Sequence, residues 1–143
     1  MCDTCGCVDL EATSRTGQDG FATITVLKDL FAENDHQAVH NREHFNRHGV
    51  FAINLMSSPG AGKTLLLEKT IEALKDEYAT GVIVGDLETE NDAVRIRKQG
   101  VPVIQITTGQ ACHLDAHLVH QALHALPLDE LDIVFIENVG NLV

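Results

Sequence analysis

The fold of this chain is decided by the stretch Ser57-Ser58-Pro59-Gly60-Ala61-Gly62-Lys63-Thr64. An apolar run, residues 50–56, precedes it, and a helix-like run, residues 65–78, follows it. A strand, a glycine-containing turn and a helix form the context that a phosphate-binding P-loop requires. The N–H groups of such a turn point into one concave site, and the helix N-terminus adds a partial positive charge. The stretch therefore predicts a site for the phosphates of a nucleotide.

Individual residues of this turn have separable roles. Lys63 can reach the terminal phosphates, and the Thr64 hydroxyl can ligate a magnesium ion held between them. The pattern G-x-x-x-x-G-K-[ST] is met except at its first position, where Ser57 stands. The alternative is a glycine-rich turn with a chance Lys-Thr pair, but strand, loop and helix all agree with the P-loop. The nucleotide-binding residues expected here are Ser58, Gly60, Ala61, Gly62, Lys63 and Thr64.

Length and charge limit the classes of partner. The 143 residues suit one domain with a real core. The net charge of −11, from 21 acidic and 10 basic residues, argues against nucleic acid and against an anionic membrane surface. No stretch approaches the ~20 apolar residues of a spanning helix. The N-terminus also lacks the basic and apolar regions of a secretory signal. We therefore expect a cytoplasmic protein that binds neither nucleic acid nor membrane.

Strand-like and helix-like runs alternate after residue 49. Residues 50–56, 81–86, 101–107 and 131–136 read as strands, the first of them buried; residues 65–78, 90–99 and 108–126 read as helices or lead into them. Continuous apolar strands are typical of a parallel sheet covered on both faces. The expected fold class is α/β, a three-layer P-loop NTPase-like domain with a mostly parallel sheet.

The residues before this domain divide into two parts. Residues 1–20 read as a flexible, metal-binding N-terminal segment. Flexibility is expected because residues 11–20 are polar and contain glycine, and metal binding because three cysteines fall within residues 2–7. Residues 21–49 read as an N-terminal helical region with a strand-like start, Phe21–Val26, and a stop at Gly49. The predicted domains are thus residues 1–20, residues 21–49 and a P-loop nucleotide-binding domain, residues 50–143.

Two carboxylates follow predicted strands. Asp86 and Glu137 each lie where the carboxyl end of a strand meets the nucleotide of a P-loop enzyme. Asp86 is a candidate for the magnesium shell or for orienting an attacking water; alternatively it caps the next turn. Glu137 is the candidate second acid of the magnesium shell, and the N–H of Gly140 can then contact the γ-phosphate. The alternative is an ordinary strand end.

Four cysteines in a reducing compartment favour metal binding or reactive thiols over disulfides. Cys2, Cys5 and Cys7 place several thiolates within reach of one soft or borderline metal, such as nickel, zinc, copper(I) or an iron–sulfur cluster. The alternative is an exposed, redox-labile tail. Cys112 and His113 are expected in the first turn of a helix, which lowers a cysteine pKa. Together they supply half of a four-coordinate site, so a second chain or another segment must complete it.

All eight histidines fall in two groups of four. The first group, His36, His40, His44 and His48, recurs every four residues, so pairs on one helix face could bind a metal. We expect a solvated polar face instead, because the neighbouring residues are equally hydrophilic. The second group, His113, His117, His120 and His124, is expected opposite the apolar face of its helix, toward solvent or a partner subunit.

Four stretches spanning nearly the whole chain match one family. They are residues 2–7 (CDTCGC), residues 54–64 (NLMSSPGAGKT), residues 85–96 with their GD, NDA and RI segments, and residues 108–116 (TGQACHLDA) with residues 137–142 (ENVGNL). Through these motifs the sequence resembles the hydrogenase nickel-incorporation GTPases, the HypB family. Together the motifs are far more specific than the P-loop alone.

The resemblance implies a metallochaperone that hydrolyses GTP and delivers nickel to [NiFe]-hydrogenase precursors. It implies a nickel site at Cys2, Cys5 and Cys7, and a second nickel or zinc site at Cys112 and His113 that is shared across a nucleotide-dependent homodimer. The implied cofactors are GTP, Mg²⁺ and Ni²⁺, with Zn²⁺ as an option at the second site. The implied partners are other hydrogenase maturation proteins and the hydrogenase large subunit.

In the expected mechanism, Lys63, Thr64, Asp86 and Glu137 form the catalytic set. Thr64 holds magnesium with Asp86 and Glu137 in its shell, and Lys63 with the loop N–H groups neutralises charge on the phosphates. GTP and GDP then bias two dimer arrangements that bind metal differently.

The chain departs from the family pattern at its end. In the family another cysteine follows the Glu-x-x-Gly segment, and an Asn-Lys-x-Asp motif reads guanine; the chain stops at Val143, before both. A C-terminally truncated domain is therefore expected. The alternative function is a nickel-holding binding module on a non-hydrolysing nucleotide-binding scaffold. The cysteine motifs argue against a urease nickel GTPase or a cobalamin-enzyme chaperone, and a small-molecule kinase lacks an acceptor-site signature.

Overall fold

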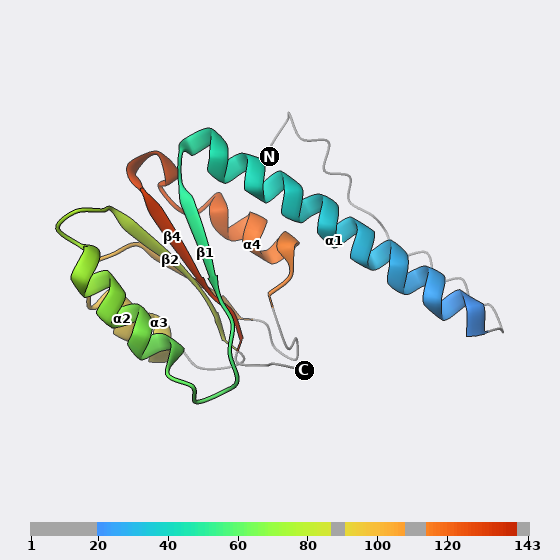
Figure 1. The fold of residues 1–143 in the computed structure, drawn as a ribbon, viewed down its shortest axis with the longest axis horizontal. Coiled ribbons are helices and arrows are strands. Elements are labelled where there is room, and N and C mark those ends of the chain that lie inside the picture. Colours follow the sequence, from blue (N-terminus) through green and yellow to red (C-terminus); the bar gives the residue numbers. More distant parts are fainter. Residues whose placement is uncertain (1–19, 87–90, 108–113, 140–143) are drawn as a thin grey trace. The chain divides into compact units, whose positions relative to one another are not determined.

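The computed structural model describes residues 20–86, 91–107 and 114–139, with the side chains of all of these except residues 20–31, Asp86 and Asn91 (Figure 1). The chain divides into two compact units, Met1–Phe31 and Ala32–Val143. All of the described side chains belong to the second unit. The elements in chain order are α1 (Gly20–His48), β1 (Phe51–Leu55), α2 (Lys63–Leu74), β2 (Thr80–Asp86), α3 (Asn91–Arg97), β3 (Val103–Thr107), α4 (Ala116–Leu123), a 3₁₀ turn (Leu128–Glu130) and β4 (Ile133–Glu137).

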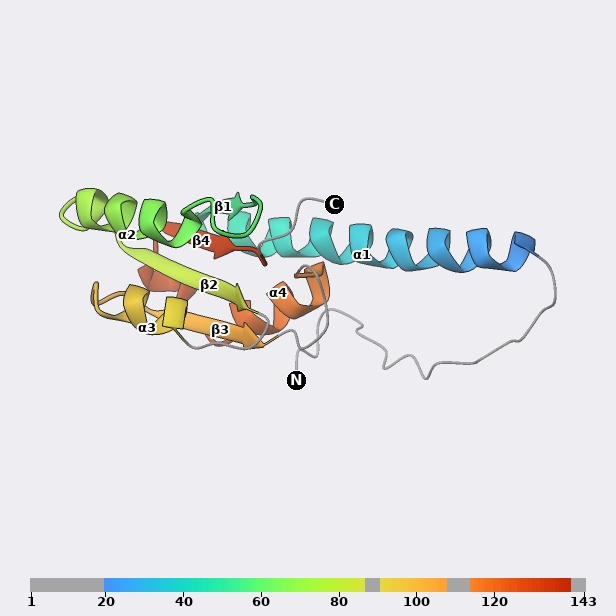
Figure 2. The same ribbon diagram turned by 90° about the horizontal axis from the view of Figure 1, so that it is seen from below.

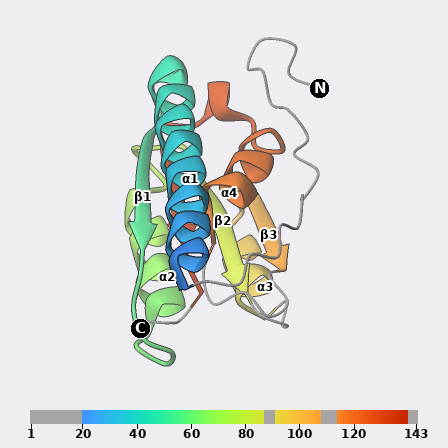
Figure 3. The same cartoon turned by 90° about the vertical axis from the view of Figure 1, so that its right-hand side faces the viewer.

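The described strands form one parallel sheet with the order β1-β4-β2-β3. Helices α2 and α3 cover one face, and α4 with the C-terminal part of α1 covers the other (Figure 1, Figure 2). The end-on view shows the C-terminal part of α1 beside α4 on the same side of the sheet (Figure 3). Every parallel pairing needs a crossover, and here each crossover carries a helix back over a face. The expected α/β fold with a parallel sheet is confirmed.

Alternation along the strands assigns side chains to the two layers. Val82 and Val84 pack with Leu67 and Ile71 of α2, whereas Ile83 packs on the opposite face with residues of α1 and α4. These side chains are fully or almost fully buried. Burial on both faces explains why the strand is apolar throughout rather than alternating with polar residues.

The first strand lies at an edge of the sheet, and the expectation of a buried strand over residues 50–56 is wrong. Strand β1 pairs only with β4 among the described strands, and Phe51 is 66% exposed. An apolar run predicts a strand, but it does not say whether a neighbour lies on both sides. Val50, just before β1, is the residue of this run that enters the core with Phe45.

The segment Phe21–Val26 is helical and not a strand, since α1 runs without interruption from Gly20 to His48. Its β-branched residues favour a strand only weakly, and such propensities are overridden by context. The predicted stop is confirmed: the helix ends at His48, and Gly49 follows with φ +70°. That left-handed conformation is the usual helix terminator and favours glycine.

Helix α4 begins later than the sequence suggests. Asp115 is its N-cap, and the carboxylate accepts a 2.8 Å hydrogen bond from the N–H of Leu118. Cys112 and His113 precede this cap and lie outside the described residues, as does Gly140. In the part of the chain that the structure describes, no helix is long and apolar enough to span a membrane.

Five histidines meet between α1 and α4. The expectation of a solvated face for the first group, and of a face toward solvent or a partner subunit for the second, is therefore wrong for these residues, whereas His36 and His117 are exposed. This histidine cluster consists of His40, His44 and His48 from α1 and of His120 and His124 from α4, with ring centroids 4.7–6.3 Å apart. His120 is only 6% exposed. The apolar face of α4 does pack on the sheet as predicted, but α1 covers the adjoining face. A helical wheel drawn for α4 alone cannot show that cover.

Burial makes the cluster unfavourable for protons. Desolvation, followed by the charges of His124, His40, His44 and His117, lowers the pKa of His120 to about 4. Desolvation, then His48, His124, Arg47 and His40, also lowers the pKa of His44. A lowered pKa means that the unfolded chain binds protons at a higher pH than the folded chain does. The contribution of these histidines to the free energy of unfolding is therefore fully present above about pH 6.5 and is lost as the pH drops toward 4.

For the metal-free chain, we expect His120 to contribute a loss of about 3 kcal/mol in the free energy of unfolding between pH 7 and pH 4. Urea unfolding in EDTA at a series of pH values measures it. His120→Gln should flatten this part of the pH profile, whereas His36→Gln, an exposed change on α1, should leave it unaltered. Equal slopes for both variants would contradict the assignment.

Candidate nucleotide-phosphate site

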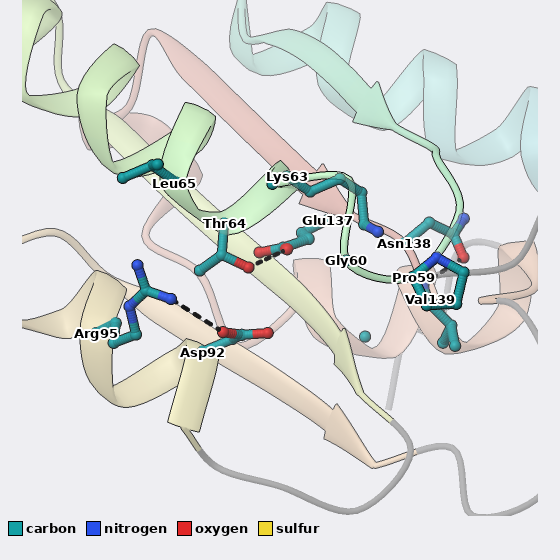
Figure 4. A pocket seen from close by; sticks show the side chains of 12 residues that line it. Pro59, Gly60, Lys63, Thr64, Leu65, Asp92, Arg95, Glu137, Asn138 and Val139 are labelled. Atoms are coloured by element: carbon teal, nitrogen blue, oxygen red, sulfur yellow. Dashed lines mark hydrogen bonds and ion pairs between the residues drawn. The ribbon is translucent and has the colours of Figure 1, made fainter.

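A cavity of about 420 Å³ opens at the carboxyl ends of β2 and β4, next to the N-terminus of α2 (Figure 4). Parallel α/β sheets bind ligands at this end because loops and helix N-termini converge there. The cavity is lined by Pro59, Gly60, Gly62, Lys63, Thr64, Leu65, Gly85, Asp92, Arg95, Glu137, Asn138 and Val139.

Two glycines give the loop its shape. Gly60 and Gly62 have φ of +73° and +88°, a region that strains residues with a Cβ. Gly62 is the N-cap of α2 and has no side chain to satisfy the first N–H groups of the helix. Those N–H groups and the helix dipole are therefore available to an anion in the cavity. Ser58 and Ala61 belong to the same loop but do not line the cavity.

Lys63 lies back across the loop that precedes it. Its Nζ donates to Ser57 Oγ at 3.1 Å and approaches the Ser57 carbonyl oxygen at 3.5 Å. The residue that departs from the P-loop pattern thus contacts the loop lysine. This contact holds the ammonium group at the rim of the cavity, where it can exchange a hydroxyl partner for a phosphate oxygen.

A buried hydrogen bond joins α2 to β4. Thr64 Oγ1 donates to Glu137 Oε1 at 2.7 Å, and the two residues are 9% and 3% exposed (Figure 4). The pair brings a hydroxyl and a carboxylate from distant parts of the sequence to one point on the cavity wall. Hard divalent cations such as Mg²⁺ prefer oxygen ligands of this kind. The donor set therefore fits magnesium.

The other predicted site residues are placed less completely. Asp86 ends β2 at the same edge of the sheet as Glu137, but its side chain lies outside the described residues. Gly140 and the expected metal ligands Cys2, Cys5, Cys7, Cys112 and His113 lie outside them too. Gly85, directly before Asp86, lines the cavity.

Sequence reasoning missed an arginine on the cavity wall. Arg95 of α3 forms a two-point interaction with Glu68 of α2, with nitrogen–oxygen distances of 3.0 and 2.8 Å, and its Nη1 lies 3.8 Å from Asp92 Oδ1. A guanidinium held by a fork of this kind keeps a defined position. Because Arg95 lines the cavity, it adds positive charge near the expected phosphates. In the sequence, Arg95 stands only as part of residues 85–96, one of the stretches that match the family, and no role is assigned to it there.

Asn138 is a second residue that the sequence did not single out. Its side-chain Oδ1 accepts from the N–H of Leu114 at 2.9 Å and from the N–H of Val139 at 3.0 Å. Its own backbone N–H donates to Leu55 at 3.0 Å. Asn138 is buried and follows Glu137 directly, so it ties the end of β4 to β1 and to the start of the α4 segment.

Comparison with known families supports a nucleotide site. The family model described as "CobW/HypB/UreG, nucleotide-binding domain" matches residues 51–143. The hydrogenase maturation factor HypB of Rhizobium leguminosarum bv. viciae is 55% identical over 120 residues, which make up 84% of this chain and 40% of that protein.

Two crystal structures have the same fold. HypB from Helicobacter pylori, solved in complex with nickel, superposes with a TM-score of 0.71 at 44% identity, over 76% of this chain and 52% of that one. The hydrogenase maturation factor HypB from Archaeoglobus fulgidus superposes with a TM-score of 0.70 at 42% identity, over 78% of this chain and 54% of that one. The chain thus spans about half the length of the relatives that it matches.

Proposed function

Because this chain belongs to the CobW/HypB/UreG family of nucleotide-binding domains, we propose that it binds GTP with Mg²⁺, hydrolyses it, and serves nickel insertion during hydrogenase maturation. The relatives named as HypB are hydrogenase maturation factors, and one was solved with nickel. The single observation that carries the nucleotide part is the buried Thr64–Glu137 hydrogen bond beside the glycine loop.

Each residue of the site has a role in this proposal. Thr64 Oγ1 and a Glu137 oxygen would hold Mg²⁺, with Asp86 completing the shell or orienting the attacking water. When bound, the ion neutralises charge on the β- and γ-phosphates. Lys63, the loop N–H groups and Arg95 stabilise the charge that develops as water attacks the γ-phosphorus and the bond to the GDP oxygen breaks. The products are GDP and phosphate.

The metal part of the proposal uses residues outside the described structure. Cys2, Cys5 and Cys7 form one nickel site, and Cys112 with His113 contributes to a second nickel or zinc site across a nucleotide-dependent homodimer. Thiolate and imidazole ligands suit both metals. The proposed partners are other hydrogenase maturation proteins and the hydrogenase large subunit, in the cytoplasm.

The nucleotide part is tested by binding a fluorescent GTP analogue in the presence of Mg²⁺, with unlabelled GTP and ATP as competitors. We expect saturable binding that GTP displaces more effectively than ATP, and release of phosphate from GTP. Circular dichroism on the same sample reports whether the chain is folded. Absence of binding by a folded chain would reject the nucleotide proposal and favour a nickel-holding module.

A further inference from the structure

Two histidine nitrogens within the histidine cluster lie at the spacing of neighbouring metal ligands. Nε2 of His120 and Nε2 of His124 are 3.2 Å apart. Zinc and similar ions bind imidazole nitrogen at about 2.0–2.1 Å, which places adjacent nitrogens about 2.8–3.0 Å from each other in an octahedral site and about 3.3–3.4 Å in a tetrahedral one. The two residues are four apart on α4 and so share a helix face.

Asn41 of α1 sets the protonation of His120. Its Nδ2 donates to the carbonyl oxygen of Ala116 at 2.6 Å, so its Oδ1 is the atom that faces His120 Nδ1 at 3.0 Å. The hydrogen of His120 must then be on Nδ1, which leaves a lone pair on Nε2. Metal-binding histidines are typically oriented in this way, with the distal ring nitrogen donating to an oxygen of the protein. His120 is more than nine-tenths buried.

Helix α1 offers the next donor. The His44 ring centroid lies 5.4 Å from that of His124 and 6.0 Å from that of His120. Nδ1 of His44 and Nδ1 of His40 are buried and have no hydrogen-bond partner among the described residues. Within the described part of the chain, no three such side chains already surround a single point. A third ligand therefore requires one of these rings to rotate.

The geometry points to a divalent transition-metal site between α1 and α4, with His120 and His124 as its closest pair of ligands and His44 as the third. Imidazole donors suit Ni²⁺, Zn²⁺ and Cu²⁺, and do not suit Mg²⁺. This site uses no cysteine and no residue of the nucleotide cavity, so it stands apart from the proposed GTPase and its cysteine metal sites. Without metal, the 3.2 Å contact is a hydrogen bond in which His124 donates to the His120 lone pair.

The test uses the full chain with Cys2, Cys5, Cys7 and Cys112 replaced by serine, so that the thiolate sites are removed. Isothermal titration with NiCl₂ and ZnCl₂ measures affinity and stoichiometry, and Co²⁺ absorption reports the ligands. We expect one ion per chain, a cobalt spectrum without a thiolate charge-transfer band, and no competition from Mg²⁺.

The deciding variant is His124→Gln in that background. Its side-chain amide can still donate to His120, and position 124 is exposed, so the packing of the two helices is expected to survive; circular dichroism checks this. We expect metal affinity to fall at least about tenfold, which corresponds to about 1.4 kcal/mol. His36→Gln, an exposed histidine on α1 outside the cluster, is the matched control and should bind as before.

Two results would overturn the proposal. One is the absence of stoichiometric Ni²⁺ or Zn²⁺ binding by the folded serine background, which would leave only the hydrogen bond. The other is unchanged affinity in His124→Gln. Neither result depends on nucleotide, so the failure of this site and the failure of the proposed GTPase are distinguishable.

Discussion

Replacing Lys63 with alanine is expected to weaken Mg²⁺–GTP binding about 10- to 100-fold and to lower turnover by a further factor on the order of 100. The reason is that Lys63 supplies a positive charge beside the glycine loop, where its Nζ donates a hydrogen bond to Ser57 Oγ. Charge-assisted contacts to phosphate are stronger than the neutral ones that water would provide. Competition binding and phosphate release measure the two effects.

Lys69→Ala is the matched control for this change. Lys69 is on the same helix but exposed, and it pairs with Glu72 at 2.7 Å, away from the cavity. Its removal should leave binding and turnover within about twofold, since exposed ion pairs contribute little. If Lys63→Ala hydrolysed GTP as fast as the unaltered chain, the assigned role of the loop lysine would be wrong.

Glu137→Gln is expected to reduce Mg²⁺-dependent turnover on the order of 100-fold and to raise the Mg²⁺ concentration needed for half-maximal activity. The glutamine carbonyl can still accept the hydrogen bond from Thr64 Oγ1 that is seen at 2.7 Å. The change therefore removes the charge that would attract the cation while keeping the contact between α2 and β4. A magnesium titration of phosphate release measures the shift.

Two further variants separate metal binding from packing. Thr64→Ser keeps the hydroxyl and should retain Mg²⁺ dependence, whereas Thr64→Val removes it and should resemble Glu137→Gln. Thermal unfolding of all variants in EDTA reports any general loss of stability. An unchanged magnesium titration for Glu137→Gln would exclude this carboxylate from the ion's surroundings.

The glycine loop allowed much of the fold to be predicted from the sequence. A strand before it and a helix after it follow from local pattern, and the apolar run at residues 81–86 indicated a sheet buried on both faces. The meeting of Thr64 with Glu137 followed from a general property of parallel sheets, whose carboxyl ends share one edge. None of these inferences required knowledge of how distant helices pack.

The errors concern contacts that local pattern does not encode. Phe51 is as apolar as a core residue, yet it lies on an edge strand because, among the strands that the structure describes, only β4 pairs with β1. His120 is polar, yet it is buried because α1 covers α4 and Asn41 satisfies its Nδ1. The roles of Arg95 and Asn138 depend on Glu68 and Leu114, partners 24 to 27 residues away in the sequence.

Leu114 contacts the carboxyl ends of both β2 and β4. Its N–H is held by Asn138 at the end of β4, and its side chain fills the space above Gly85 at the end of β2, where an added Cβ would come within 2.6 Å of it. Both strand ends border the cavity. Leu114 therefore couples the two strand ends. If either strand end shifts, Leu114 must move with it or lose its contacts, and Leu114 directly follows Cys112 and His113 in the chain.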